Sequence, residues 1–152
     1  MPSGAVKGKS NIGRETVPLY VHVFGHRVNF EVFFDRRALR KYLTDNRDTL
    51  KCCYVDDVAA YTYYIEGIND IDPNPIGSML FNRKDIDLST VAHECVHMTC
   101  LWTQRAKIPT PNRMEWGSQC HEDVAEFCGE LVAAVVKALD SHGIKVHNEA
   151  KS

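Results

Sequence analysis

Two histidines four residues apart, with a glutamate directly after the first, constrain this chain more than any other feature. Residues 90–99 read TVAHECVHMT, and side chains at positions i and i+4 lie one above the other on a helix. Three polar residues that can cap a helix precede the pair, namely Asp85, Asp87 and Ser89. Apolar residues give the segment a side to bury, namely Val91, Ala92, Val96, Cys100 and Leu101. The pattern predicts a helix that ends near Ala106.

On such a helix, His93 and His97 can bind one metal ion between them. Glu94 lies one step round from His93, where a carboxylate can accept a proton from a water bound to that metal. In a chain of 152 residues with 7 histidines, the expected number of chance matches to this pattern is roughly 0.02, so the match is informative. The sequence therefore predicts a Zn²⁺ site with Glu94 as general base. The competing interpretation is a core helix whose histidines only form hydrogen bonds.

Length and composition favour a single domain with an ordinary core. The chain has 152 residues, of which 44% are hydrophobic and 25% charged. A formal net charge of -2 argues against a large electropositive surface, so we expect no nucleic-acid partner. Four basic residues do cluster locally, and we interpret them as a solvated helix face: Arg36, Arg37, Arg40 and Lys41.

Neither export nor membrane insertion is expected from the sequence. The first ten residues lack the apolar stretch of a secretory signal, and no run approaches eighteen apolar residues. The six cysteines are not spaced like a disulfide scaffold or a structural zinc site, and Cys95, Cys100 and Cys128 fall inside expected helices, which suits reduced thiols. We therefore expect a cytoplasmic protein that does not associate with membranes. The sequence leaves its oligomeric state open.

The order of the expected elements is that of an α+β domain. Alternating residues predict a β-hairpin over 17–34, and Asp35 is expected to cap a helix over 36–44. Strands are expected over 59–65 and 76–81, and the last helix over 119–140. We predict a mobile segment over 1–14, one compact domain over 15–143 and a polar tail over 144–152.

A zinc ion bound by two histidines needs a third protein ligand if one position is to stay open for chemistry. The last helix offers Glu122, in its first turn. Several residues share a face with it, and the small ones are expected to let this helix approach the histidine helix closely: Ala125, Glu126, Gly129 and Ala133. Three neighbours stay open as alternative ligands: Cys120, His121 and Glu126. Glu122 and Glu126 can also be simple surface acids that favour the helix dipole.

These residues resemble the gluzincin arrangement of zincin-like metallopeptidases, in which His-Glu-x-x-His is followed, after a loop, by a helix that carries a glutamate. The resemblance covers residues 85–140 and implies that Glu122 completes the zinc site and that Glu126 orients an imidazole. The earlier half is similar in element order to compact zincins, including small phage and bacterial examples. It implies a zincin-like domain with a small, mostly antiparallel sheet packed on the two helices, and a strand over 76–81 whose open edge can pair with an extended peptide. Residues 101–107 lack the glycine and third histidine of metzincins.

The expected function is zinc-dependent hydrolysis of a peptide or related amide bond, with a peptide or protein as substrate. No second subdomain is evident that would supply a further catalytic residue, and this favours an alternative. In the alternative, the protein is a metal-stabilised binding or regulatory module with a zincin fold and little or no peptidase activity.

Overall fold

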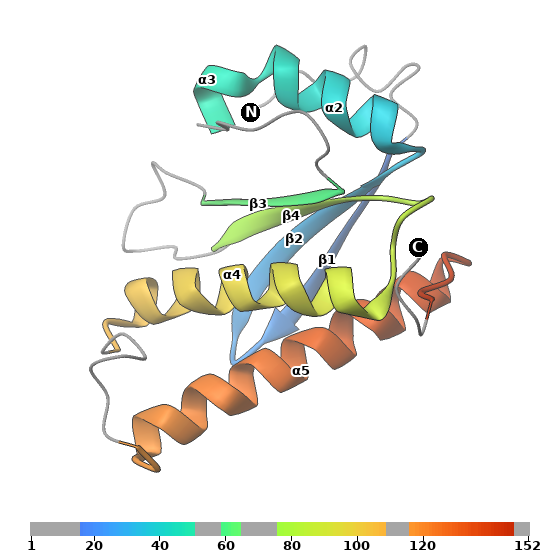
Figure 1. Cartoon of the computed structure of the whole chain (residues 1–152). Coiled ribbons are helices and arrows are strands. Elements are labelled where there is room, and N and C mark those ends of the chain that lie inside the picture. The colour runs from blue at the N-terminus through green and yellow to red at the C-terminus, as the bar shows by residue number, and fades with distance from the viewer. Residues whose placement is uncertain (1–15, 51–58, 65–75, 109–115, 148–152) are drawn as a thin grey trace.

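The sheet of this protein lies between two layers of helices (Figure 1). The computed structural model describes residues 16–50, 59–64, 76–108 and 116–147. The elements in chain order are β1 (Val17–Val23), β2 (His26–Phe33), α2 (Arg36–Asp45), α3 (Arg47–Leu50), β3 (Ala60–Tyr64), β4 (Gly77–Asn82), α4 (Leu88–Ala106) and α5 (Gln119–Ser141). Helices α2 and α3 lie on one face of the sheet, and α4 and α5 lie on the other. The predicted α+β fold is confirmed, and the expected segment over 1–14 lies outside the described residues.

The hairpin of β1 and β2 turns at Phe24 and Gly25, both of which have positive φ, at 52° and 78°. Two consecutive residues with positive φ match the right-handed twist of the flanking antiparallel strands. The Phe24 ring packs edge-on against Trp102 of α4 and Phe127 of α5, at centroid distances of 5.7 and 5.6 Å. Those two rings stack on each other at 4.3 Å. The hairpin tip is thereby joined to both helices.

The sheet has the strand order β1-β2-β4-β3. Strands β1 and β2 pair antiparallel, β2 and β4 parallel, and β3 and β4 antiparallel. The prediction of a mostly antiparallel sheet is therefore confirmed. The expectation that the strand before the histidine helix has an open edge is wrong, because β4 pairs with a strand on each side. Strand β3 takes the end position instead.

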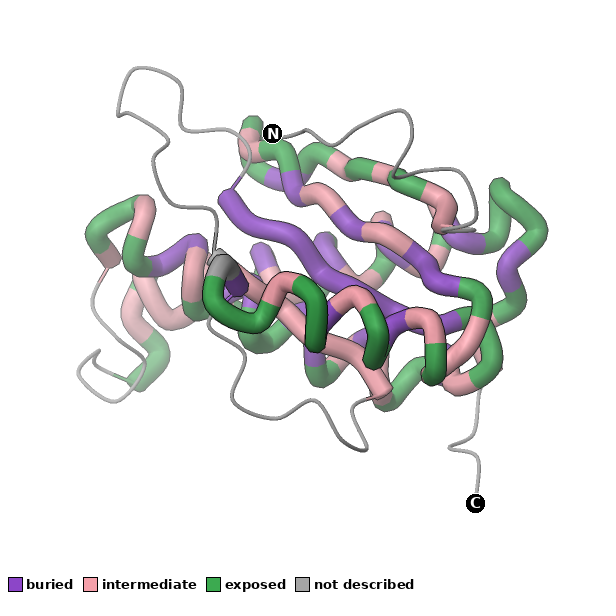
Figure 2. Tube along the Cα trace, turned by 90° about the horizontal axis from the view of Figure 1, so that it is seen from above, coloured by how far each residue is buried: buried purple, intermediate pink, exposed green. Residues whose placement is uncertain are grey.

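Two apolar clusters hold the layers together. The larger lies between the sheet and helices α4 and α5, and includes Phe30, Met98 and Leu131. The smaller lies between the opposite face and α2, and includes Phe33 and Leu39. Successive strand residues point to opposite faces, so each inner strand can supply both clusters. Figure 2 shows the resulting buried stretches along the strands and the alternation of buried and exposed residues along the helices.

Helix α4 is fixed at its start and along its length. Asp87 caps it, because the Asp87 carboxylate accepts a hydrogen bond from the Thr90 amide at 2.7 Å. Asp85 instead pairs with Arg36 of α2 at 3.1 Å. Gly77 in β4 allows a close approach, since a Cβ atom there would lie 2.5 Å from the Tyr63 carbonyl oxygen and 3.3 Å from the Met98 side chain. The histidine helix thus packs directly on the sheet.

The chain after Gly143 is not a free tail as far as it is described. Ile144 is buried in the larger cluster. The His147 carbonyl accepts a hydrogen bond from the Leu88 amide at 2.8 Å, and its amide donates to the Ile86 carbonyl at 3.2 Å. The packed domain therefore extends to His147. Among the described residues, no helix combines the length and apolarity needed to cross a membrane.

The aromatic contact between the helices predicts a large stability difference between two substitutions. Phe127→Ala removes a fully buried ring and should lower the free energy of unfolding by about 3–5 kcal/mol. Val96→Ala, at a position of α4 that is 53% exposed, should change it by less than about 0.5 kcal/mol. Urea unfolding of both variants measures the difference. Equal losses would contradict the packing described here.

Candidate metal centre

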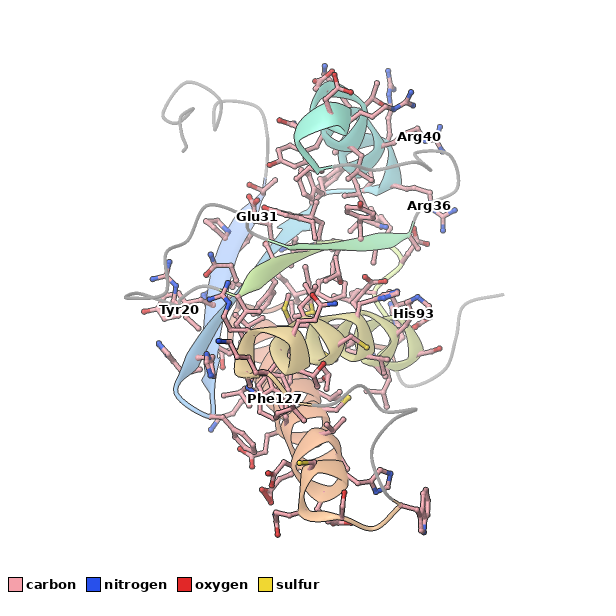
Figure 3. All side chains as sticks on the ribbon, turned by 90° about the vertical axis from the view of Figure 1, so that its left-hand side faces the viewer. Tyr20, Glu31, Arg36, Arg40, His93 and Phe127 are labelled. Atoms are coloured by element: carbon pink, nitrogen blue, oxygen red, sulfur yellow. The ribbon has the colours of Figure 1, made fainter. Side chains whose placement is uncertain are left out.

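Helix α4 divides the three residues of the His-Glu-x-x-His pattern between two environments. His93 and His97 are exposed, and Figure 3 shows the His93 side chain at the surface of α4. Glu94 is only 5% exposed and lies on the side of the helix that faces the sheet. Because the histidines are exposed, they are not the core residues of the competing interpretation.

The two imidazoles converge. The Nε2 atoms of His93 and His97 lie 3.3 Å apart, and the rings meet at 75° with centroids 4.9 Å apart. Zn–N bonds of 2.0–2.1 Å at a tetrahedral angle place two nitrogen ligands about 3.3–3.4 Å apart. The two nitrogens therefore fit two ligand positions of one zinc ion. A hydrogen bond between the rings is possible at the same distance when one nitrogen carries a proton.

The Glu94 carboxylate lies beside this pair. Its Oε2 atom is 3.9 Å from His93 Nε2. Its Oε1 atom accepts a hydrogen bond from the Thr62 hydroxyl at 2.6 Å. The carboxylate is thus held from the β3 side, while its second oxygen lies near the His93 imidazole. This is the place from which a general base can reach a metal-bound water.

Thr62 is a residue of this site that the sequence analysis missed. Tyr61 and Tyr63 pack against the α2 side of the sheet, so the strand alternation directs Thr62 toward α4. A polar residue on the strand face that α4 covers is the feature of the sequence that could have identified Thr62. The position of the strand relative to α4 depends on long-range pairing, which the local pattern does not contain.

The structure does not bring Glu122 or Glu126 to the histidines. Both are exposed on α5. The small residues of the same face, Ala125, Gly129 and Ala133, are exposed too, and a Cβ atom added at Gly129 would meet open space. Glu122, Glu126 and the small residues share one face of α5, as predicted. That face points to solvent, because the stripe with Phe127 and Leu131 is the one that packs on the core.

The helix packing explains why Glu122 lies away from the pair. Trp102, near the end of α4, stacks on Phe127, while Leu88, at its start, lies beside Val136 of α5. The helices therefore run antiparallel. Glu122 precedes Phe127 and lies toward the Trp102 end of α4, whereas His93 precedes Trp102 by nine residues, which is roughly 14 Å along a helix. Within the described part of the chain, no three His, Cys, Asp or Glu side chains gather closely enough to hold a metal.

The alternative ligands beside Glu122 are not at the pair either. His121 packs against the exposed Trp116 ring, with centroids 4.6 Å apart, and Cys120 is half-buried at the start of α5. Neither forms a three-ligand group with the histidines. The third ligand therefore stays a prediction, whereas the two imidazoles and the nearby carboxylate are brought together.

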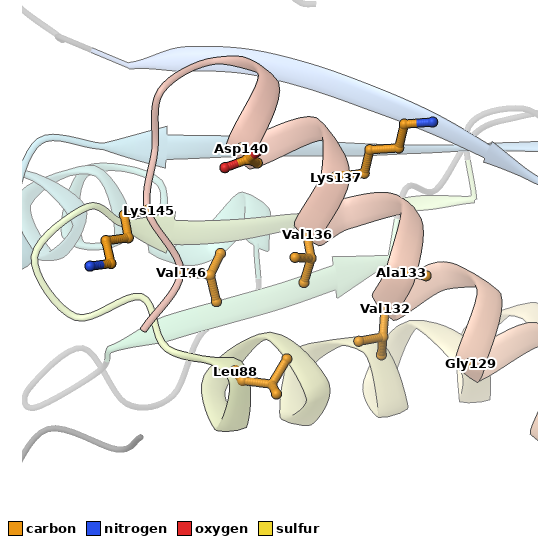
Figure 4. Close-up of a pocket in the computed structure, with 9 residues that line it drawn as sticks. All are labelled: Leu88, Gly129, Val132, Ala133, Val136, Lys137, Asp140, Lys145 and Val146. Atoms are coloured by element: carbon orange, nitrogen blue, oxygen red, sulfur yellow. The ribbon is translucent and has the colours of Figure 1, made fainter. Parts of the chain in front are cut away.

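A separate groove of about 700 Å³ runs between α5, the start of α4 and the chain after α5 (Figure 4). Its lining is mainly apolar and includes Leu88, Val132, Val136 and Val146, with Lys137 and Asp140 at the rim. Neither histidine of the pair lines it.

Comparison of the chain with protein-family models, with curated proteins and with solved structures gives no match. The function proposed for the site therefore rests on its geometry.

Cys95 is expected to be inert although it lies between the two histidines in sequence. It is fully buried, and burial together with Cys128 and Glu94 raises the pKa of its thiol to about 12. A raised pKa leaves almost no thiolate near pH 8, and the thiolate is the reactive form. Cys95→Ser should therefore leave the number of fast-reacting thiols of the folded protein unchanged, while Cys100→Ser, at an exposed position, should lower it by one. Reaction with a chromogenic disulfide before and after denaturation measures both, and fast labelling at Cys95 would contradict the assignment.

Proposed function

We propose that this protein is a zinc-dependent hydrolase that cleaves a peptide or related amide bond. The observation that carries the proposal is the convergence of His93 and His97, whose Nε2 atoms are 3.3 Å apart, beside the buried Glu94 carboxylate. Two nitrogen atoms at the spacing of zinc ligands, with a carboxylate 3.9 Å from one of them, are two of the three protein ligands and the base that zinc-assisted hydrolysis uses.

In this mechanism His93 and His97 would hold the zinc ion, since their Nε2 atoms lie 3.3 Å apart. When bound, zinc lowers the pKa of a coordinated water to about 7 and polarises a carbonyl group. Glu94 accepts the proton of the attacking water at Oε2 and then donates it to the departing amine. Thr62 holds the other carboxylate oxygen throughout. The proposed site needs a third ligand, and the structure does not bring Glu122, which the resemblance to gluzincins implies for that role, to the two histidines.

The proposed substrate is a peptide or protein, because both imidazoles are open to a large ligand. A cytoplasmic location is part of the proposal. The described cysteines, Cys95, Cys100, Cys120 and Cys128, are free thiols, which suits a reducing compartment. No nucleic acid is proposed as a partner, since the chain carries a net charge of -2.

One observation favours a second candidate function. The outward position of Glu122 and Glu126 leaves the two histidines without a third ligand among the described residues. A site with two protein ligands suits a metal-stabilised binding or regulatory module, which needs no activated water. Zinc binding with no turnover on any peptide would favour this candidate.

The proposal predicts which histidines bind zinc. Loss of a residue that only supports a ligand costs about 10–100-fold in affinity, so removal of a ligand itself, in His93→Ala or His97→Ala, should cost at least about 100-fold. The matched control is His22→Ala, at an exposed position of β1, which should bind zinc like the wild type. Competition with a chromogenic chelator measures the affinities. Glu122→Ala in the same series tests the third ligand, and equal affinities in all variants would refute the site.

The proposal also predicts separate effects on metal binding and turnover. Glu94→Gln keeps the shape of the side chain but removes the proton acceptor, so zinc content should be unchanged while kcat falls by about 10²–10⁴-fold. Glu130→Gln, at an exposed position of α5, is the control and should retain full turnover. A library of internally quenched peptides provides the assay. Full activity in the Glu94 variant would show that another group is the base.

A further inference from the structure

The Thr62 hydroxyl joins the end strand β3 to helix α4 at the candidate metal centre. Thr62 Oγ1 lies 2.6 Å from Glu94 Oε1 and 3.5 Å from the main-chain oxygen of Glu94. A threonine hydroxyl has one proton to donate, so the shorter contact receives it. Strong hydroxyl-to-carboxylate bonds are about 2.5–2.7 Å long, and this contact falls in that range.

The bond gives the two oxygens of the carboxylate different surroundings. Oε1 is held by Thr62, while Oε2 lies 3.9 Å from His93 Nε2. Within the described part of the chain, the Thr62 hydroxyl is the group that donates to this carboxylate. A glutamate side chain has three rotatable bonds, and Glu94 needs one of its orientations to present Oε2 to the histidine side.

Thr62 is itself held firmly. It pairs with Met79 in the β3–β4 ladder, and the neighbouring Tyr61 hydroxyl donates to the Leu50 carbonyl at 3.1 Å. A β-branched side chain in a strand has restricted χ1 freedom. The hydroxyl therefore has a fixed position from which to orient the flexible Glu94.

We propose that Thr62 is a positioning residue, which fixes the Glu94 carboxylate so that Oε2 faces the metal-binding nitrogens of His93 and His97. The inference rests on the proposed hydrolase function for its kinetic consequence. Thr62 contacts neither imidazole in any interaction described above, so it acts through Glu94 and not through the metal. An error of about 1 Å in the position of a catalytic group can reduce a rate by about 10²-fold.

The first test uses the metal-free protein and needs no activity. A hydroxyl proton bonded to a buried carboxylate exchanges slowly with water, so proton NMR should detect one in the wild type. Thr62→Val and Glu94→Ala should both remove that resonance. Thr99→Val is the matched control, because the Thr99 hydroxyl bonds the Cys95 carbonyl at 2.7 Å and not the carboxylate. A Thr62 resonance that persists in Glu94→Ala would overturn the inference.

The second test uses zinc-loaded protein and an internally quenched peptide that the wild type cleaves. Thr62→Val should lower kcat by about 10–100-fold with KM nearly unchanged, and its zinc affinity should remain that of the wild type. Thr62→Ser restores the hydroxyl and should recover most of kcat. An unchanged kcat in Thr62→Val, a serine variant as slow as the valine variant, or a loss of zinc affinity in Thr62→Val would each overturn the positioning role.

The two tests separate the two claims. A wild type that binds zinc but cleaves no peptide contradicts the proposed hydrolase. The NMR comparison and the zinc affinities then decide whether Thr62 orients Glu94 beside the metal. Normal turnover in wild type together with full turnover in Thr62→Val contradicts only the role of Thr62.

Discussion

The packing of α4 against the sheet is the constraint on which the rest of the site depends. Val91, Cys95 and Met98 bury one side of the helix, and this fixes the rotation of the helix about its axis. With that rotation, His93 and His97 are exposed to solvent, and the Glu94 carboxylate accepts a hydrogen bond from Thr62 on the sheet face that α4 covers. A rotation of one residue in one direction would move both imidazoles to the buried positions of Glu94 and Met98, and a rotation in the other direction would expose the Glu94 carboxylate. The apolar core therefore determines the chemistry that the surface can present.

Much of the fold could be predicted from local patterns. The hairpin, the cap at Asp35 and the long helices follow from spacing and capping chemistry, and the structure confirms them; of the three possible caps before α4, Asp87 takes the role. The place of β4 inside the sheet could not be predicted in the same way. Its parallel partner, β2, lies more than forty residues earlier in the chain, and local alternation does not encode which strands become neighbours.

The site was predictable to the extent that it lies on one helix. The spacing of His93 and His97 determines their convergence whatever surrounds them. The positions of the α5 and β3 residues depend on how separate elements pack against each other, and there the structure differs from the predictions. The shared face of Glu122 and Gly129 was predicted, but its direction was not, because Phe127 and Leu131 compete for the core and bury the opposite side. Thr62 was missed for a related reason, since its partner lies 32 residues away.

The account requires that both imidazoles bind the same ion. X-ray absorption spectroscopy at the zinc edge of the loaded protein measures this most directly, because it reports the ligands of the metal whatever the substrate. We predict a site with two imidazole nitrogens at about 2.0–2.1 Å, and loss of imidazole scattering when both histidines are replaced. A loaded wild type without imidazole scattering, or a protein that takes up no zinc at all, would contradict the account.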